Sequence, residues 1–244
     1  MARHSYPTKR CEAGKDNIFI DVGRKSLKEV EALGIEIGNV VTYPDSFFVL
    51  NEDKFVCRAL DNRIGGFMIA QVAKLLHTNN IQLPFGVYFA NCVQEEVGSY
   101  GAEMIASTIN PNVAFVTDVT HDTTSPLINE KQEGHAELGK EPILTVSPSV
   151  HNKLRQRLVD TARANNIPFQ QLASSKSTGT DTDAFAYSHD GIASVLISLP
   201  IRYMHTTVEM VDKTDVENTV RLLYESLLQL NDGESFDYIK PFKK

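Results

Sequence analysis

The alternation of short apolar runs with longer helical patterns beyond Ala59 most constrains the fold of this chain. Runs at 87–93, 114–119, 143–146 and 194–199 are typical of buried strands, and apolar residues recur at helical spacing between them. Strands that alternate with helices indicate layers of helices packed on a sheet. The pattern therefore predicts an α/β domain over residues 59–244, whose last helix starts with a capping box from Thr214 to Glu217.

The first 58 residues have a different texture. Short β-type runs at 17–22, 40–43 and 47–50 surround one helical segment at 26–33, with Ser26 as its cap. This pattern predicts a small β-rich module ahead of the α/β domain. At the other end, the residues beyond Asp232 are polar and aromatic, and we expect them to be only loosely ordered.

Composition narrows the classes of function. The 244 residues contain 42% hydrophobic residues, enough for a substantial core, but no run near the ~18 apolar residues that a membrane span needs. A net charge of -7 argues against binding to nucleic acid or to anionic lipid, since both need clustered Lys and Arg. The three cysteines, Cys11, Cys57 and Cys92, are widely spaced, which fits a reducing compartment, so we expect a cytoplasmic protein.

Four segments that follow apolar runs each present a metal-type ligand or an acid. Asp61 follows VCRAL, Glu95 and Glu96 follow VYFANCVQ, Asp118 ends AFVTDV, and His205 follows ASVLISLP. A sheet gathers the ends of its strands at one edge, so residues far apart in the chain can converge there. The sequence therefore predicts a site of the kind that a two-metal hydrolase needs.

Each of these residues also has a purely structural interpretation. Asp61 could cap the following helix, and Glu95 and Glu96 could be acids of a first helical turn. Adjacent acids repel one another, however, unless a cation or a proton intervenes. Their side chains diverge in an extended segment, so one can bind a metal while the other faces the attacking water. The same divergence argues against a glycosidase, whose two carboxylates flank one bond.

Three further expectations concern the surroundings of this site. Glu209, four residues after His205, could accept the ring N–H of that histidine, as metal-binding histidines usually require. Asp181 and Asp183 in GTDTDAF either line the substrate pocket or form a polar turn. The five histidines without a comparable setting, His151 among them, are expected at the surface.

The motifs ALDNRIGG, VQEEVGSYGA, FVTDVT, GTDTDAF and ISLPIRYMHTTVE resemble, in order and approximate spacing, those of the M42 metallo-aminopeptidases, over residues 16–230. That family includes glutamyl aminopeptidase and the tetrahedral aminopeptidases. The resemblance implies a central mixed β-sheet flanked by helices at 59–244, preceded at 1–58 by part of an inserted β-rich oligomerisation domain. It also implies hydrolysis of the N-terminal residue of short peptides, by a homo-oligomer built from dimers, up to a dodecamer.

The resemblance further implies a role for each candidate residue. Asp61 would bridge two divalent ions, Asp118 would complete one metal site, and Glu96 with His205 would complete the other. Glu95 would be the general base, taking a proton from the attacking water and later delivering one to the departing amine. Carboxylates and imidazole suit zinc, cobalt or manganese alike.

One departure from the family pattern bears on activity. Family members carry an N-terminal His-x-Asp motif whose His ligates the first metal, and this sequence contains no such motif. His4 lies in a segment that resembles the insertion, so the ligand role is not assigned to it. The first metal site thus keeps only Asp61 and Asp118, and we expect weak or absent binding there and impaired activity. A non-catalytic assembly or binding paralogue, and another binuclear amidohydrolase such as a deacylase, remain alternatives. The family also implies a cis peptide bond between Asp61 and Asn62.

Overall fold

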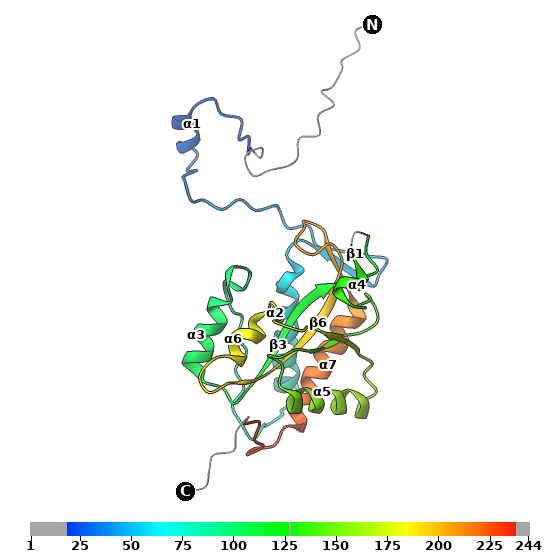
Figure 1. Cartoon of the computed structure of the whole chain (residues 1–244). Helices are drawn as coiled ribbons and strands as arrows, with labels where there is room; N and C mark the ends of the chain where they lie inside the picture. The colour runs from blue at the N-terminus through cyan, green and yellow to red at the C-terminus, as the bar shows by residue number, and fades with distance from the viewer. Residues whose placement is uncertain (1–18, 127, 238–244) are drawn as a thin grey trace. The chain divides into compact units, whose positions relative to one another are not determined.

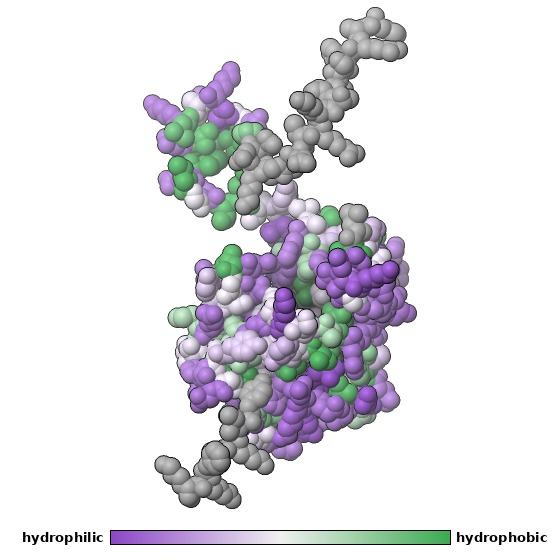
Figure 2. All heavy atoms as spheres, in the orientation of Figure 1, coloured by the Kyte–Doolittle hydropathy of each residue, from purple (hydrophilic) through white to green (hydrophobic). Residues whose placement is uncertain are grey.

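The computed structural model describes residues 19–126 and 128–237, and the chain divides into two compact units between Tyr43 and Pro44. In the first unit, helix α1 (Leu27–Glu31) begins after Ser26, whose side chain accepts from the Glu29 amide, as predicted. The strands expected at 17–22 and 40–43 are absent from their described residues. The apolar side chains of this unit, Ile37 for example, are open to solvent (Figure 2). The described residues of this unit form no sheet. The predicted domain boundary at residue 58 stays a prediction.

A four-stranded mixed sheet, in the order β3-β6-β4-β5, forms the centre of the second unit. Its paired strands β3 and β6 are labelled in Figure 1. β3 (Val113–His121) runs parallel to β6 (Ala193–Ile201), and β4 (Ile143–Val146) runs antiparallel to β6 and parallel to β5 (Gln170–Ala173). All nine residues of β6 are buried, as expected for a strand covered on both faces. The predicted α/β class and three of its predicted strands are confirmed.

A smaller antiparallel sheet joins β1 (Phe48–Leu50), β2 (Lys54–Cys57) and β7 (Glu209–Asp212). Strand β7 follows β6 after a short loop, and β2 leads directly into helix α2 (Leu60–Thr78). The pairing between Cys57 and Glu209 thus brings the start of α2 next to the end of β6. Two chain segments about 150 residues apart meet at this point, which is where the candidate ligands Asp61 and His205 lie.

Helices α2 and α5 each pack on α7, and all three contact the sheet (Figure 1). Helix α6 also contacts the sheet, at β3 and β6, and α3 packs against α6. The bounds beyond α2 are α3 (Tyr100–Ile109), α4 (Glu130–Glu133), α5 (Asn152–Ala164), α6 (Asp181–Ala186) and α7 (Lys213–Gln229). Almost fully buried side chains between these layers include Met68, Leu144, Leu158, Ile197, Leu199 and Leu222. Among the described residues, no helix is both long and apolar enough to cross a bilayer.

The structure corrects four expectations. Residues 87–93 form no strand, because no described strand pairs with them. Helix α7 is capped by Asp212, whose side chain accepts from the Thr214 amide at 2.7 Å, so Thr214 lies inside the helix. His151 is buried and caps α5, and its ring meets that of Phe236 edge-on. The chain beyond Asp232 is therefore anchored at least as far as Phe236, which is 6% exposed.

Truncation of a core leucine tests this packing. Leu222 on α7 is fully buried, whereas Leu228 on the same helix is 38% exposed. We expect Leu222→Ala to lower the free energy of unfolding by about 2–5 kcal/mol, since it removes buried methyl groups and leaves a cavity. Leu228→Ala serves as the matched control and should change stability much less. Urea unfolding of both variants measures the difference, and equal effects would contradict the assigned core.

Candidate metal centre

The first turn of α2 fixes the position of Asp61. The peptide bond between Asp61 and Asn62 is cis, as the family resemblance implied. The Asn62 side chain donates to the Thr117 carbonyl of β3 at 2.7 Å and accepts from the Gly65 amide at 3.0 Å. A Cβ at Gly65 would collide with this Asn62 amide, so glycine is needed there. Asn62 therefore ties the Asp61 turn to the central sheet, a role that the sequence interpretation missed.

Glu209 at the start of β7 connects Asp61 with His205. Its side chain is buried, and its two carboxylate oxygens accept from the main-chain amides of Asp61 at 3.0 Å and His205 at 2.8 Å. The prediction that Glu209 binds the ring N–H of His205 is wrong, since the carboxylate bonds to the backbone instead. His205 itself has φ 63, a left-handed conformation that non-glycine residues rarely adopt. One buried carboxylate thus holds the backbone of both candidate ligands.

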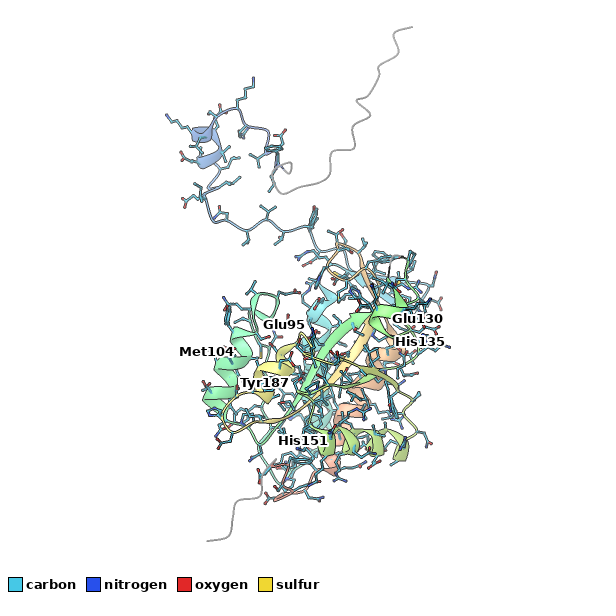
Figure 3. All side chains as sticks on the ribbon, viewed as in Figure 1. Glu95, Met104, Glu130, His135, His151 and Tyr187 are labelled. Carbon is cyan, nitrogen blue, oxygen red and sulfur yellow. The ribbon has the colours of Figure 1, made fainter. Side chains whose placement is uncertain are left out.

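Glu95 and Glu96 lie in a single turn of 3-10 helix, η2 (Glu95–Val97), just before α3. Figure 3 labels Glu95 at this turn. The Gly101 amide donates to the Val93 carbonyl at 3.0 Å, and a Cβ at Gly101 would overlap the Val93 backbone. This close approach, which only glycine permits, anchors the turn on the first residues of α3. The extended segment expected here is therefore a helical turn, in which Glu95 is half-buried and Glu96 is exposed.

Asp61, Glu96 and His205 converge on one point. Each offers a ligand atom, and the three atoms lie within 4.8 Å of one another. The His205 Nε2 atom is 3.0 Å from Asp61 Oδ2 and 3.5 Å from Glu96 Oε2. Two ligands bound tetrahedrally at the usual zinc distances of about 2.0–2.2 Å stand roughly 3.3 Å apart. The donor set and its spacing therefore fit a single divalent ion with an open fourth position.

Asp118, at the carboxyl half of β3, lies outside this group of three. Its side chain is 7% exposed, and its Oδ1 atom accepts from the Val119 amide at 2.8 Å. Burial raises the pKa of Asp118 to about 8, although the Val119 N–H opposes the rise and the charges of Glu95 and Asp61 add to it. Asp118 is thus a buried acid near the cluster, without the three-ligand geometry of the other site.

The acids at the centre share an unfavourable concentration of negative charge. Burial raises the pKa of Asp61 to about 6, with further repulsion from Glu96 and a partial offset from His205. Burial also raises the pKa of Glu95 to about 7, and repulsion from Asp181 is the next largest cause. A cation would relieve this repulsion. The electrostatics therefore favour metal binding and leave Glu95 able to exchange a proton near neutral pH.

Asp181 is brought to the same region by the start of α6. Burial raises the pKa of its carboxyl group, and the neighbouring side chains of Ser99 and Cys92 oppose that rise. Thiol burial beside this acid raises the pKa of Cys92 to about 12. Asp183 instead accepts from the amide of Thr178 at 2.9 Å, as a polar turn does. The pocket interpretation thus suits Asp181 and the turn interpretation suits Asp183, while the environment of Cys92 had no signal in the sequence.

The high pKa of Asp118 predicts how metal-free protein responds to pH. A carboxyl group whose pKa is higher in the folded state than its unfolded value near 3.9 binds protons better when folded. The free energy of unfolding should therefore fall as pH rises from about 4 to about 8, by at most about 1.4 kcal/mol per pH unit for this group. Asp118→Asn should flatten that fall. Urea titrations at pH 5 and pH 8 in chelator measure it, and an unchanged slope would contradict it.

Substitution of Glu209 tests the backbone brace. Glu209→Gln replaces one of the two accepting oxygens with a donor, so one of the Asp61 and His205 amides loses its partner. Loss of such supporting groups typically weakens metal binding about 10–100-fold. We expect that range for zinc measured by competition with a chromophoric chelator. Glu217→Gln, on the exposed part of α7, is the control and should bind zinc normally.

Comparisons with known proteins identify the family of this chain. A model of the M42 glutamyl aminopeptidase family matches residues 2–222. Lysyl aminopeptidase of Pyrococcus furiosus is 36% identical over 88% of this chain and 60% of its own length. The crystal structure of a TET aminopeptidase from a marine sediment thaumarchaeon superposes with a TM-score of 0.81 and 30% identity, covering 87% of this chain and 60% of that one.

A second solved structure, the TET1 peptidase of Pyrococcus horikoshii, gives a TM-score of 0.74 at 27% identity over 93% of this chain and 67% of that chain. The 244 residues span about 60% of the length of the first two relatives. The family match nevertheless covers most of this chain, including every candidate site residue. The chain belongs to the M42 glutamyl aminopeptidase family.

Proposed function

We propose that this chain is the catalytic part of a divalent-metal aminopeptidase, which removes the N-terminal residue of short peptides. The convergence of Asp61, Glu96 and His205 beside Glu95 carries the proposal. The M42 family supports a peptide substrate with a free amino terminus. The same carboxylate-rich region would attract that terminal ammonium group, which suits an exopeptidase.

Each residue has a distinct part in the proposed reaction. Asp61, Glu96 and His205 hold one divalent ion, zinc, cobalt or manganese, and Asp61 with Asp118 face a second. When bound, the metal polarises the scissile carbonyl and lowers the pKa of water. Glu95 accepts the proton of the attacking water and delivers a proton to the departing amine. A pKa near 7 before metal binding matches this exchange.

The second metal position is proposed to be the weaker one. Asp61 and Asp118 are the protein ligands proposed for it among the described residues, and the sequence has no His-x-Asp motif to supply a histidine. Catalytic zinc sites usually have three protein ligands and an open position. We therefore expect tight binding of one ion, weak binding of a second, and reduced turnover.

A homo-oligomer is also part of the proposal. The TET1 peptidase of Pyrococcus horikoshii can assemble into a tetrahedron or a large octahedral shell. The exposed apolar residues of the first unit are compatible with burial at contacts between copies. Cytoplasmic location fits the free Cys57 and Cys92 thiols. The domain division at 58 and its oligomerisation role belong to the same proposal.

Metal content and turnover on one sample test the function. Chelator-stripped protein is dialysed against zinc or cobalt, its metal content per chain is measured, and hydrolysis of a panel of aminoacyl and N-acyl anilides follows. Bound metal with hydrolysis of free-amine substrates alone supports an aminopeptidase. Preference for N-acyl substrates would instead indicate a deacylase. Metal binding without any turnover would make the chain, by itself, a non-catalytic member of the family.

A further inference from the structure

The loop between β6 and β7 presents His205, and its backbone is unusual. Tyr203 has φ 59 and His205 has φ 63, so two non-glycine residues of one short loop are left-handed. Such conformations persist only where the surrounding structure holds them in place. Glu209 holds the His205 amide at the far end of the loop. The start of the loop therefore needs an anchor of its own.

Arg202 is that anchor, through both its main chain and its side chain. Its amide donates to the Met210 carbonyl at 3.0 Å and its carbonyl accepts from the Met210 amide at 3.1 Å, which closes the loop on β7. Its guanidinium donates through Nε to Asp122 Oδ2 and through Nη2 to the Thr124 hydroxyl, the latter at 3.2 Å. The side chain thus ties the loop to the segment that follows β3.

Asp122 is a fully buried carboxylate, at 0% exposure. Its other oxygen, Oδ1, accepts from the Thr124 amide at 2.9 Å and from the Thr124 hydroxyl at 2.6 Å. Burial alone would raise the pKa of Asp122, but the bonds from Thr124 and Arg202 hold that pKa below its ordinary value. Among the described residues, Arg202 is the only cation that pairs with this charged group. Removal of the guanidinium would leave a buried charge without its counterion.

This ion pair lies where two segments with candidate ligands leave the sheet. Asp122 and Arg202 come immediately after the last paired residues of β3 and β6, which are parallel neighbours. Their side chains therefore join the two points at which the chain leaves these strands. Asp118 lies four residues before Asp122 on β3, and His205 lies three residues after Arg202 on the loop. The pair thus connects the two ligand-bearing segments directly.

We propose that Arg202 is a positioning residue of the metal centre, which orients His205 by clamping its loop to Asp122. The inference rests on the proposed metal site but not on turnover. The described contacts of the guanidinium are with Asp122 and Thr124 and with none of the three converging ligands, so its effect reaches the metal through the loop backbone. Loss of a group that orients a metal ligand typically weakens metal binding about 10–100-fold.

Zinc affinity, together with hydrogen exchange of the metal-free protein, tests the proposal. Arg202→Gln should weaken zinc binding about 10–100-fold, measured by competition with a chromophoric chelator, and should speed exchange of the amides at 203–208. Arg157→Gln is the matched control, because it breaks an Arg–Glu ion pair whose arginine is 36% exposed, against 35% for Arg202. The control should leave both measurements unchanged. Normal zinc binding by Arg202→Gln, or an equal loss in Arg157→Gln, would overturn the proposal.

A double-mutant cycle determines whether Arg202 acts through His205. His205→Ala removes the imidazole, so the orientation of its loop no longer affects the metal. Adding Arg202→Gln to His205→Ala should therefore weaken zinc binding further by less than about threefold, whereas independent effects would multiply. A full additional loss in the double variant would contradict the assigned route.

Urea unfolding of each variant without metal verifies that it is folded. If Arg202→Gln does not fold, Arg202→Lys supplies the test, because lysine keeps the charge but lacks the planar fork that reaches two oxygens at once. Arg202→Lys should weaken zinc binding about two- to tenfold, and unchanged affinity would overturn the proposal. None of these measurements needs substrate, so an absence of turnover leaves the inference testable, and a failed clamp leaves the proposed activity untouched.

Discussion

Glu95→Gln should lower turnover of an aminoacyl anilide by about 10²–10⁴-fold, the usual contribution of a positioned general acid or base. Glutamine keeps the size of the side chain but cannot accept the proton of the attacking water. Glu95 is not among the three converging ligands, so the metal content per chain should stay unchanged. The expected result is therefore a folded, metal-loaded and nearly inactive protein, measured by anilide release and metal analysis on the same sample.

The pH profile sharpens this prediction. Glu95 must be ionised to act as a base, and its pKa is about 7 without metal. A bound cation lowers that value, so kcat/KM should rise with pH and level off at or below about 7. The acidic limb should be absent from any residual activity of Glu95→Gln. Glu103→Gln, on the exposed face of α3, is the control. Full activity in Glu95→Gln would exclude Glu95 as the base.

Local patterns predicted the strongly periodic elements well. The apolar stripe beginning at Ile64 appears as α2, and the buried runs at 114–119, 143–146 and 194–199 appear as β3, β4 and β6. The strand predicted at 87–93 does not form, although the composition of this segment is equally typical of a strand. A strand is completed by hydrogen bonds to a neighbour, and the described residues provide none there. Composition reports the tendency of a segment, whereas its partner decides whether a ladder forms.

In the candidate site, too, the sequence indicated which residue types take part but not the contacts that hold them in place. Asp61, Glu96 and His205 were expected at one edge of the sheet with Glu95 and Asp118, and the ligand atoms of the first three lie within 4.8 Å of one another. The contacts that hold them were harder to predict. Glu209 contacts main-chain amides, and Asn62 reaches across to β3. Such bonds depend on which backbone groups the fold leaves unpaired, and a single sequence carries little information about that.

Asp61→Asn should remove the thermal stabilisation that zinc gives to this protein. Zinc that binds only the folded state stabilises it by about 2.7 kcal/mol when its free concentration is 100 times Kd. In a domain of this size that corresponds to a rise in Tm of roughly 5–10 °C. Asp61 is the least exposed of the three ligands, at 10% of its side chain, and the charges of both Glu96 and His205 act on it. Its replacement should abolish the rise.

The same ligand predicts how zinc affinity varies with pH. A protonated carboxyl group cannot bind zinc, so binding must displace the proton that Asp61 holds below its pKa of about 6. The apparent Kd should therefore increase about tenfold per pH unit below 6, on top of any contribution from His205. Asp160→Asn, at an exposed position on α5, should keep both the Tm rise and this pH dependence. Because Asp61 carries both effects, a zinc-induced rise that persists in Asp61→Asn would place the metal elsewhere in the molecule.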